Sequence, residues 1–131
     1  MKHFIVYSAS GQILRTGTCA PGDVFLQARP GEFVTEGRAD DIRDRVVDGV
    51  ITPRPVMPVQ FDNATVPADG VSAVTFTGVP VGAAVRVTGP AEDAFTAADD
   101  VLELTFDLPG AYAVRVAQFP YRDFEVVIRA T

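Results

Sequence analysis

The segment VLELTFDLPGAYAVRVA (Val101–Ala117) indicates the fold class most clearly. Leu102, Leu104 and Phe106 alternate with polar or smaller residues, which is the period of two expected for a strand with one buried face. A Pro-Gly turn follows, and alternation resumes with Tyr112, Val114 and Val116 around Arg115. The segment therefore predicts two antiparallel strands separated by a turn.

Similar stretches lie on both sides of this segment. Strands are predicted at 71–77, 83–88, 101–107, 111–117 and 124–128, with shorter ones at 59–63 and near Phe95. About seven short strands in 70–100 residues are typical of an immunoglobulin-like sandwich, which often ties a Tyr before its penultimate strand back to the preceding loop. Tyr112 stands at that position. We expect a buried face made by Phe76, Val85, Leu104, Phe106, Tyr112, Val114, Val116, Val126 and Ile128.

The first half of the chain predicts a small β-meander. Strands are expected at 4–7, 13–18, 24–27 and 33–35, and Asp48-Gly49 between two apolar pairs predicts a two-residue hairpin. The best helical candidate is the short segment 39–45. Three prolines between positions 53 and 58 predict an extended connector. The fold prediction is thus all-β: a β-meander module at 1–58 and an immunoglobulin-like β-sandwich at 59–131.

Composition and charge narrow the function classes. The chain has 131 residues and a net charge of −6, and the excess acid lies in 59–131, which holds ten acids and four bases. Such a balance argues against a protein that neutralises nucleic-acid phosphates. One His and one Cys exclude a His-rich metal site and an intrachain disulfide. No apolar run is long enough for a signal peptide or a membrane span. We expect no membrane insertion, no cofactor, no metal and no enzymatic activity.

Few residues are candidates for a site. Arg86, Arg115 and Arg129 are predicted to share the outer face of one sheet, as an anion-binding patch or as partners of Glu125 and its neighbours. His3 and Cys19 could face each other across the first hairpin, but no orienting third group accompanies them. The acidic groups at 40–44 and 99–100 lack the spacing of a calcium-binding loop, and we expect them to be solvated turn residues.

The opening FIVYSASGQILRTGTC (Phe4–Cys19) resembles small proteins encoded among the tail genes of tailed bacteriophages. The pieces at 25–28, 35–37, 47–51 and 54–58 are similar to that family as well. The second half, with PGAYAVRV (Pro109–Val116), resembles the short immunoglobulin-like domains of phage tail, fibre and capsid-decoration proteins.

This resemblance implies a non-enzymatic structural component of a phage virion, from the tail tip or fibre region. Its partners would be other virion proteins, such as tail or fibre subunits, or further copies of itself, and it would be made in the host bacterial cytoplasm. Two alternatives stay open: a capsid decoration protein and a host-surface module that binds a glycan. A small enzyme would need a cleft holding perturbed acids, which the sequence does not indicate.

The two modules are expected to differ in their contacts. A 58-residue module buries only about 60% of its unfolded surface, and open strand edges invite pairing. We therefore expect residues 1–58 to dock onto the particle through an edge strand or an apolar face that includes Phe4 or Phe25. The acidic module 59–131 should face solvent.

Overall fold

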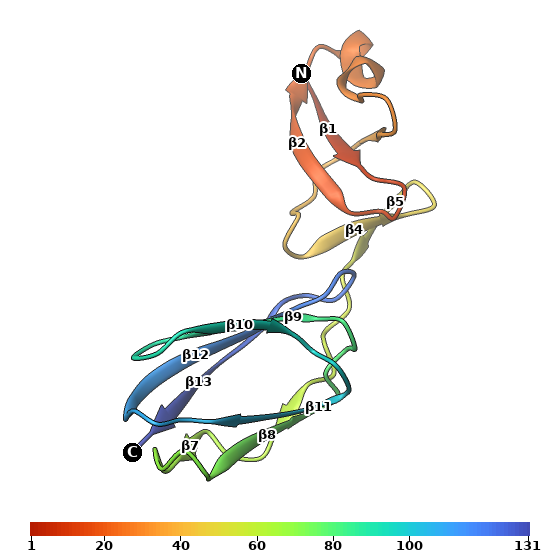
Figure 1. Cartoon of the computed structure of the whole chain (residues 1–131). Helices are drawn as coiled ribbons and strands as arrows, with labels where there is room; N and C mark the ends of the chain where they lie inside the picture. The colour runs from red at the N-terminus through yellow and green to blue at the C-terminus, as the bar shows by residue number, and fades with distance from the viewer. The chain divides into compact units, whose positions relative to one another are not determined.

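The computed structural model describes residues 1–131 and is built mainly from β-strands, which confirms the all-β prediction (Figure 1). The chain divides into two compact units, Met1–Pro55 (unit 1) and Val56–Thr131 (unit 2). The division lies three residues before the boundary predicted at residue 58.

Unit 2 consists of two sheets that share one core. One sheet has the order β10-β9-β12-β13-β7, and the other has the order β11-β8-β6. Figure 1 shows these as two layers, with β9, β10, β12 and β13 in one and β8 and β11 in the other. The bounds are β6 (Gln60–Phe61), β7 (Thr65–Val66), β8 (Ala73–Thr77), β9 (Ala84–Thr88), β10 (Asp93–Thr96), β11 (Val101–Thr105), β12 (Gly110–Ala117) and β13 (Phe124–Ala130).

Alternation along the strands of unit 2 places the core as expected. Seven of the nine residues predicted to be buried are buried, whereas Leu104 and Val126 are half-buried at its margin. Val74, Phe76 and Val114 are completely buried. Arg115 is exposed between buried neighbours, so the predicted phase of β12 is confirmed.

Tyr112 also takes the expected position. Its ring is buried, with its centroid 4.4 Å from that of Phe106, and its hydroxyl donates a hydrogen bond to the Leu108 carbonyl oxygen at 2.8 Å. A buried phenol needs a partner for its O–H. The bond therefore fixes the loop before β12.

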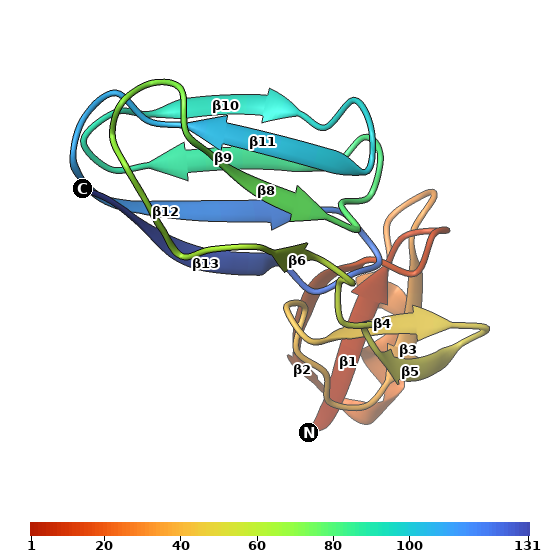
Figure 2. The ribbon, with the colours of Figure 1, turned by 90° about the horizontal axis from the view of Figure 1, so that it is seen from below.

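Unit 1 is built around one strand that is covered on both faces. The bounds are β1 (Lys2–Tyr7), β2 (Ile13–Cys19), the 3-10 helix η1 (Pro21–Gln27), β3 (Phe33–Glu36), β4 (Asp44–Val47) and β5 (Val50–Pro53). On one face of β1, Phe4 and Val6 pack with Val24 of η1. On the other face, Ile5 packs with Val46 of β4 and with the partly buried Ile51 of β5. Figure 2 shows β1 among these elements.

The predicted hairpin is confirmed, whereas the predicted meander is wrong. Asp48 and Gly49 both have positive φ, 51° and 77°, and join β4 to β5. The first sheet has the order β2-β1-β3, so β3 returns to pair with β1 and not with its sequence neighbour β2. The cause is burial, because three consecutive apolar residues, 4–6, need cover on both faces and a central place in the sheet.

Two local predictions in unit 1 are also wrong. Residues 24–27, predicted as a strand, belong to η1, which Pro21 can begin because the first helical turn needs no N–H donor there. The helical candidate 39–45 is a turn that leads into β4. Its carboxylates accept backbone N–H bonds, since Asp40 Oδ1 accepts from Ile42 and Asp44 Oδ2 accepts from Asp40. These bonds favour a turn over a helix.

The proline-rich connector ends inside unit 2. Met57 and Val59 are buried in the core that the two sheets share. These apolar side chains explain why the boundary falls before the last proline, at residues 55–56.

Candidate functional site

The helix η1 of unit 1 exposes an adjacent pair of large apolar side chains, Phe25 and Leu26. They are 78% and 76% exposed, whereas Val24 before them is 1% exposed. A 3-10 helix has three residues per turn, so Val24 can face the sheet only if the next two residues face outward. The pair is therefore a consequence of how η1 packs.

A polar clamp from β2 holds the end of this helix. Nη2 of Arg15 donates to the Gln27 carbonyl oxygen and to Glu32 Oε1, each at 2.7 Å, and Nη1 donates to Glu32 Oε2 at 3.1 Å. The Arg29 N–H donates to Glu32 as well, at 2.9 Å. The hydrogen bonds from Arg15 and Arg29 lower the pKa of Glu32 from 4.5 to about 2. The backbone beneath Phe25 and Leu26 is thus fixed.

The two residues predicted to contact a partner, Phe4 and Phe25, differ in their exposure to solvent. Phe4 is 8% exposed and belongs to the core of unit 1, where its ring lies against Gly17. Phe25 is on the surface beside Leu26, which the sequence prediction did not include. The sequence did contain a signal for this surface, because Pro21 and Asp23 mark a helix start directly before three apolar residues, 24–26. A partner would therefore meet Phe25 and Leu26, not Phe4.

Three of the four arginines of unit 2, Arg86, Arg115 and Arg129, share one outer sheet face. In the strand register Arg115 lies opposite both Arg86 and Glu125, and Arg129 has the same phase as Glu125. Arg86 and Arg115 line a shallow hollow of about 210 Å³ together with Glu125. The three positive charges are therefore not alone on this face.

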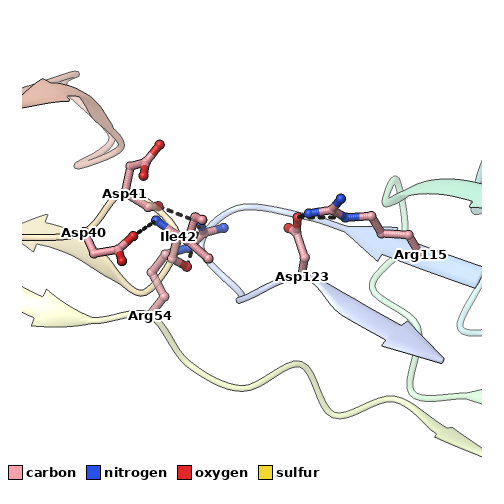
Figure 3. Close-up of polar contacts among 6 residues, drawn as sticks. All are labelled: Asp40, Asp41, Ile42, Arg54, Arg115 and Asp123. Atoms are coloured by element: carbon pink, nitrogen blue, oxygen red, sulfur yellow. Dashed lines mark hydrogen bonds and ion pairs between the residues drawn. The ribbon is translucent and has the colours of Figure 1, made fainter.

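Arg115 is paired with an acid two residues before Glu125, within the group of partners that the sequence predicted. Its Nη2 and Nε donate to Asp123 Oδ2 at 2.8 and 3.2 Å (Figure 3). Since Asp123 pairs with Arg115 and Glu125 lies opposite Arg115 in the strand register, the face combines both signs of charge. This arrangement is typical of cross-strand pairing and does not favour a concentrated anion site.

The remaining candidates take structural places. Cys19 is a free, buried thiol opposite Lys2, whereas His3 has the opposite phase and its Nε2 lies 2.8 Å from Arg38 Nη2. The sheet therefore does not bring His3 and Cys19 together. No group of three or more His, Cys, Asp or Glu side chains is arranged to hold a metal ion.

The acidic turns at 40–44 and 99–100 are held by hydrogen bonds to the backbone. Figure 3 shows the turn at 40–42, where Nη1 of Arg54 donates to the carbonyl oxygens of Asp41 and Ile42 at 3.0 and 3.3 Å. In unit 2, Asp99 Oδ1 accepts from the Val101 N–H at 2.8 Å. The carboxylates of Asp40 and Asp99, each of which accepts from the backbone N–H two residues on, thus have the local bonding of turn residues.

No protein-family model matches the chain, and neither a curated protein nor a solved structure matches it. None of its helices has the length and apolar character that a bilayer crossing requires. The resemblance to phage tail proteins therefore stays a prediction.

Proposed function

We propose that this chain is a non-enzymatic attachment protein of a tailed-phage virion, placed in the tail tip or fibre region, and that unit 1 docks it onto a neighbouring subunit. The observation that carries the proposal is the exposed pair Phe25 and Leu26 on the clamped helix η1. The phage context rests on the sequence resemblance of residues 4–19 and of the segments that follow it.

The geometry of η1 suits a contact surface. Large apolar side chains that are mostly exposed next to each other mark interaction sites more often than scattered ones do. A contact also costs less when its backbone is ordered beforehand, because less conformational entropy is lost on binding. The bonds from Arg15 to Gln27 and Glu32 provide that order.

Unit 2 is proposed to be an immunoglobulin-like sandwich that projects from the particle or bridges to another subunit. Its two sheets around one core and the bond from Tyr112 to Leu108 support this assignment. The net charge of −6 resides in this unit, and it keeps copies of the unit apart.

The docking surface is tested by the double substitution Phe25→Ser and Leu26→Ser in the full chain. Both side chains point outward, so the stability of unit 1 should change by no more than about 0.5 kcal/mol each. The amount of chain that copurifies with phage particles should fall at least tenfold. Val127→Ser is the matched control, because Val127 is 51% exposed on unit 2 and its loss should leave incorporation unchanged.

The position in the particle is tested by labelling purified particles of the phage that encodes the chain with an antibody against unit 2. Label at the tail tip or along fibres supports the proposal. Label over the head would indicate a decoration protein instead. Intact particles that carry no label would contradict a virion role, and binding of the free chain to host cells or glycans would then favour a receptor-binding module.

A further inference from the structure

The two sheets of unit 2 stand open along one edge. β10 ends one sheet and β11 ends the other, and Figure 2 shows these strands along the same edge of the two layers. Between them lies an opening of about 300 Å³. Its apolar wall is formed by Val87, Leu104, Phe106, Leu108 and Tyr112.

The side chains at this edge are incompletely covered. Phe95 of β10 and Leu102 and Leu104 of β11 have the inward phase, yet each is only half-buried against the core. No strand of the chain pairs with the outer side of β11, so its backbone donors and acceptors on that side have no sheet partner. An unpaired edge beside uncovered apolar side chains can accept an added strand.

The charge around the opening specifies what could bind. Glu92, Asp93 and Asp107 line it, and none of the three forms an ion pair within the chain. Arg86 shares an adjoining hollow with Glu92 and Asp93, but no Lys or Arg lines the opening itself. Asp93 even takes the inward phase, opposite the buried Val87, so its charge faces the opening. A second copy of this acidic unit would be repelled, whereas a basic segment would be attracted.

We propose that this edge binds an extended, basic segment of another protein. The segment adds as a strand along β11, one of its apolar side chains enters the opening against Leu104 and Phe106, and a Lys or Arg beside it meets Glu92 and Asp93. The inference goes beyond docking through unit 1 and does not require it, because it concerns a separate surface.

The probe is a blocked eight-residue peptide in which lysine and valine alternate, titrated into the ¹⁵N-labelled full chain at low salt. Chemical-shift changes should concentrate in β10, β11 and residues 91–92 and 106–108. Edge amides of β11 should also gain protection from hydrogen exchange. A peptide in which glutamate replaces lysine should cause no such changes, because it carries the same apolar residues with the opposite charge.

Two double variants separate a local site from general attraction. Glu92→Gln with Asp93→Asn should weaken binding about fivefold, since two ion pairs at the opening are lost. Asp41→Asn with Glu125→Gln removes the same charge away from the opening and from β11, and should leave the affinity within about twofold. Equal weakening by both pairs, shifts spread over all acidic residues, or no binding of the lysine peptide at millimolar concentration would each overturn the proposal. Failure of this test leaves the role of Phe25 and Leu26 unaffected.

Discussion

The two units are small β-structures that differ in how their buried cores are built. Unit 2 has one continuous core of sixteen buried residues between its sheets. Unit 1 has two separate clusters of four and three buried residues, one on each face of β1. Unit 2 therefore depends mainly on one apolar core, whereas unit 1 combines two small apolar clusters with the clamp from Arg15 to Glu32.

Because their cores differ in size, the two units leave different apolar surfaces exposed. A small core leaves little room to bury large side chains, and η1 of unit 1 leaves Phe25 and Leu26 outside. Unit 2 buries Phe76, Phe106 and Tyr112 in its core and leaves the β10–β11 edge of its sheets open. We therefore assign the main apolar contact to unit 1 and the acidic edge to unit 2.

The largest expected effect is that of Phe76→Ala in unit 2. Phe76 is completely buried, and its ring lies 6.0 Å from that of Phe61 and 6.5 Å from that of Phe124. Loss of the ring should cost about 3–5 kcal/mol, because a cavity forms in a continuous core. Hydrogen exchange of the full chain should show the loss in unit 2. Equal loss of protection in both units would mean that they unfold together, which would contradict the view that each unit is stabilised by its own core.

A close backbone approach in unit 1 predicts the next largest effect, for Gly11→Ala. Gly11 has φ of +90°, a Cβ there would overlap the Val46 carbonyl oxygen, and the Gly11 carbonyl accepts from the Val46 N–H at 2.9 Å. The strain should destabilise unit 1 by about 1–3 kcal/mol, measured by hydrogen exchange in β1 and β4. Gly22→Ala has open space around the new Cβ and should change little. A neutral Gly11→Ala would contradict the packing of β4 on the first turn.

The substitution Tyr112→Phe removes a single hydroxyl and tests whether its hydrogen bond to Leu108 stabilises unit 2. The bond to Leu108 is lost while the buried ring remains, so unit 2 should lose about 1 kcal/mol. Chemical denaturation of both chains gives the difference. An unchanged midpoint would show that the loop before β12 does not depend on this bond.

The smallest expected effect is on the pH dependence of stability, where each unit has one carboxylate with a lowered pKa. The folded pKa of Glu32 is lowered to about 2, so its stabilisation of unit 1 is present above pH 4.5 and is lost as the pH falls from about 4.5 to about 2. Glu32→Gln should therefore flatten the acid dependence of unit 1 alone. Hydrogen bonds from Ser72 and Val71 lower the pKa of Asp69 to about 2 as well, and Asp69→Asn should do the same for unit 2. If either substitution changed the acid dependence of the other unit instead, the assignment of each carboxylate to the stability of its own unit would be wrong.

Patterns among neighbouring residues predicted more of the strand structure of unit 2 than of unit 1. Alternation around Tyr112 and Arg115 set the faces of β12, and Asp48-Gly49 set a hairpin, because both signals act between neighbours in sequence. The pairing of β3 with β1 is not local, and turn residues cannot specify it. Uninterrupted apolar residues at 4–6 were the available sign of a central strand. The clamp of Arg15 on Glu32 joins residues far apart in sequence, and no motif indicates it.

The most direct test of the central claim is the surface area that each unit loses to neighbouring chains in a density map of the assembled particle. We predict that unit 1 loses the larger area and that Phe25 and Leu26 become buried within it. A basic strand on the β10–β11 edge of unit 2 would add a smaller contact. If unit 2 loses most of the area while Phe25 and Leu26 stay in solvent, the assignment of docking to unit 1 is contradicted.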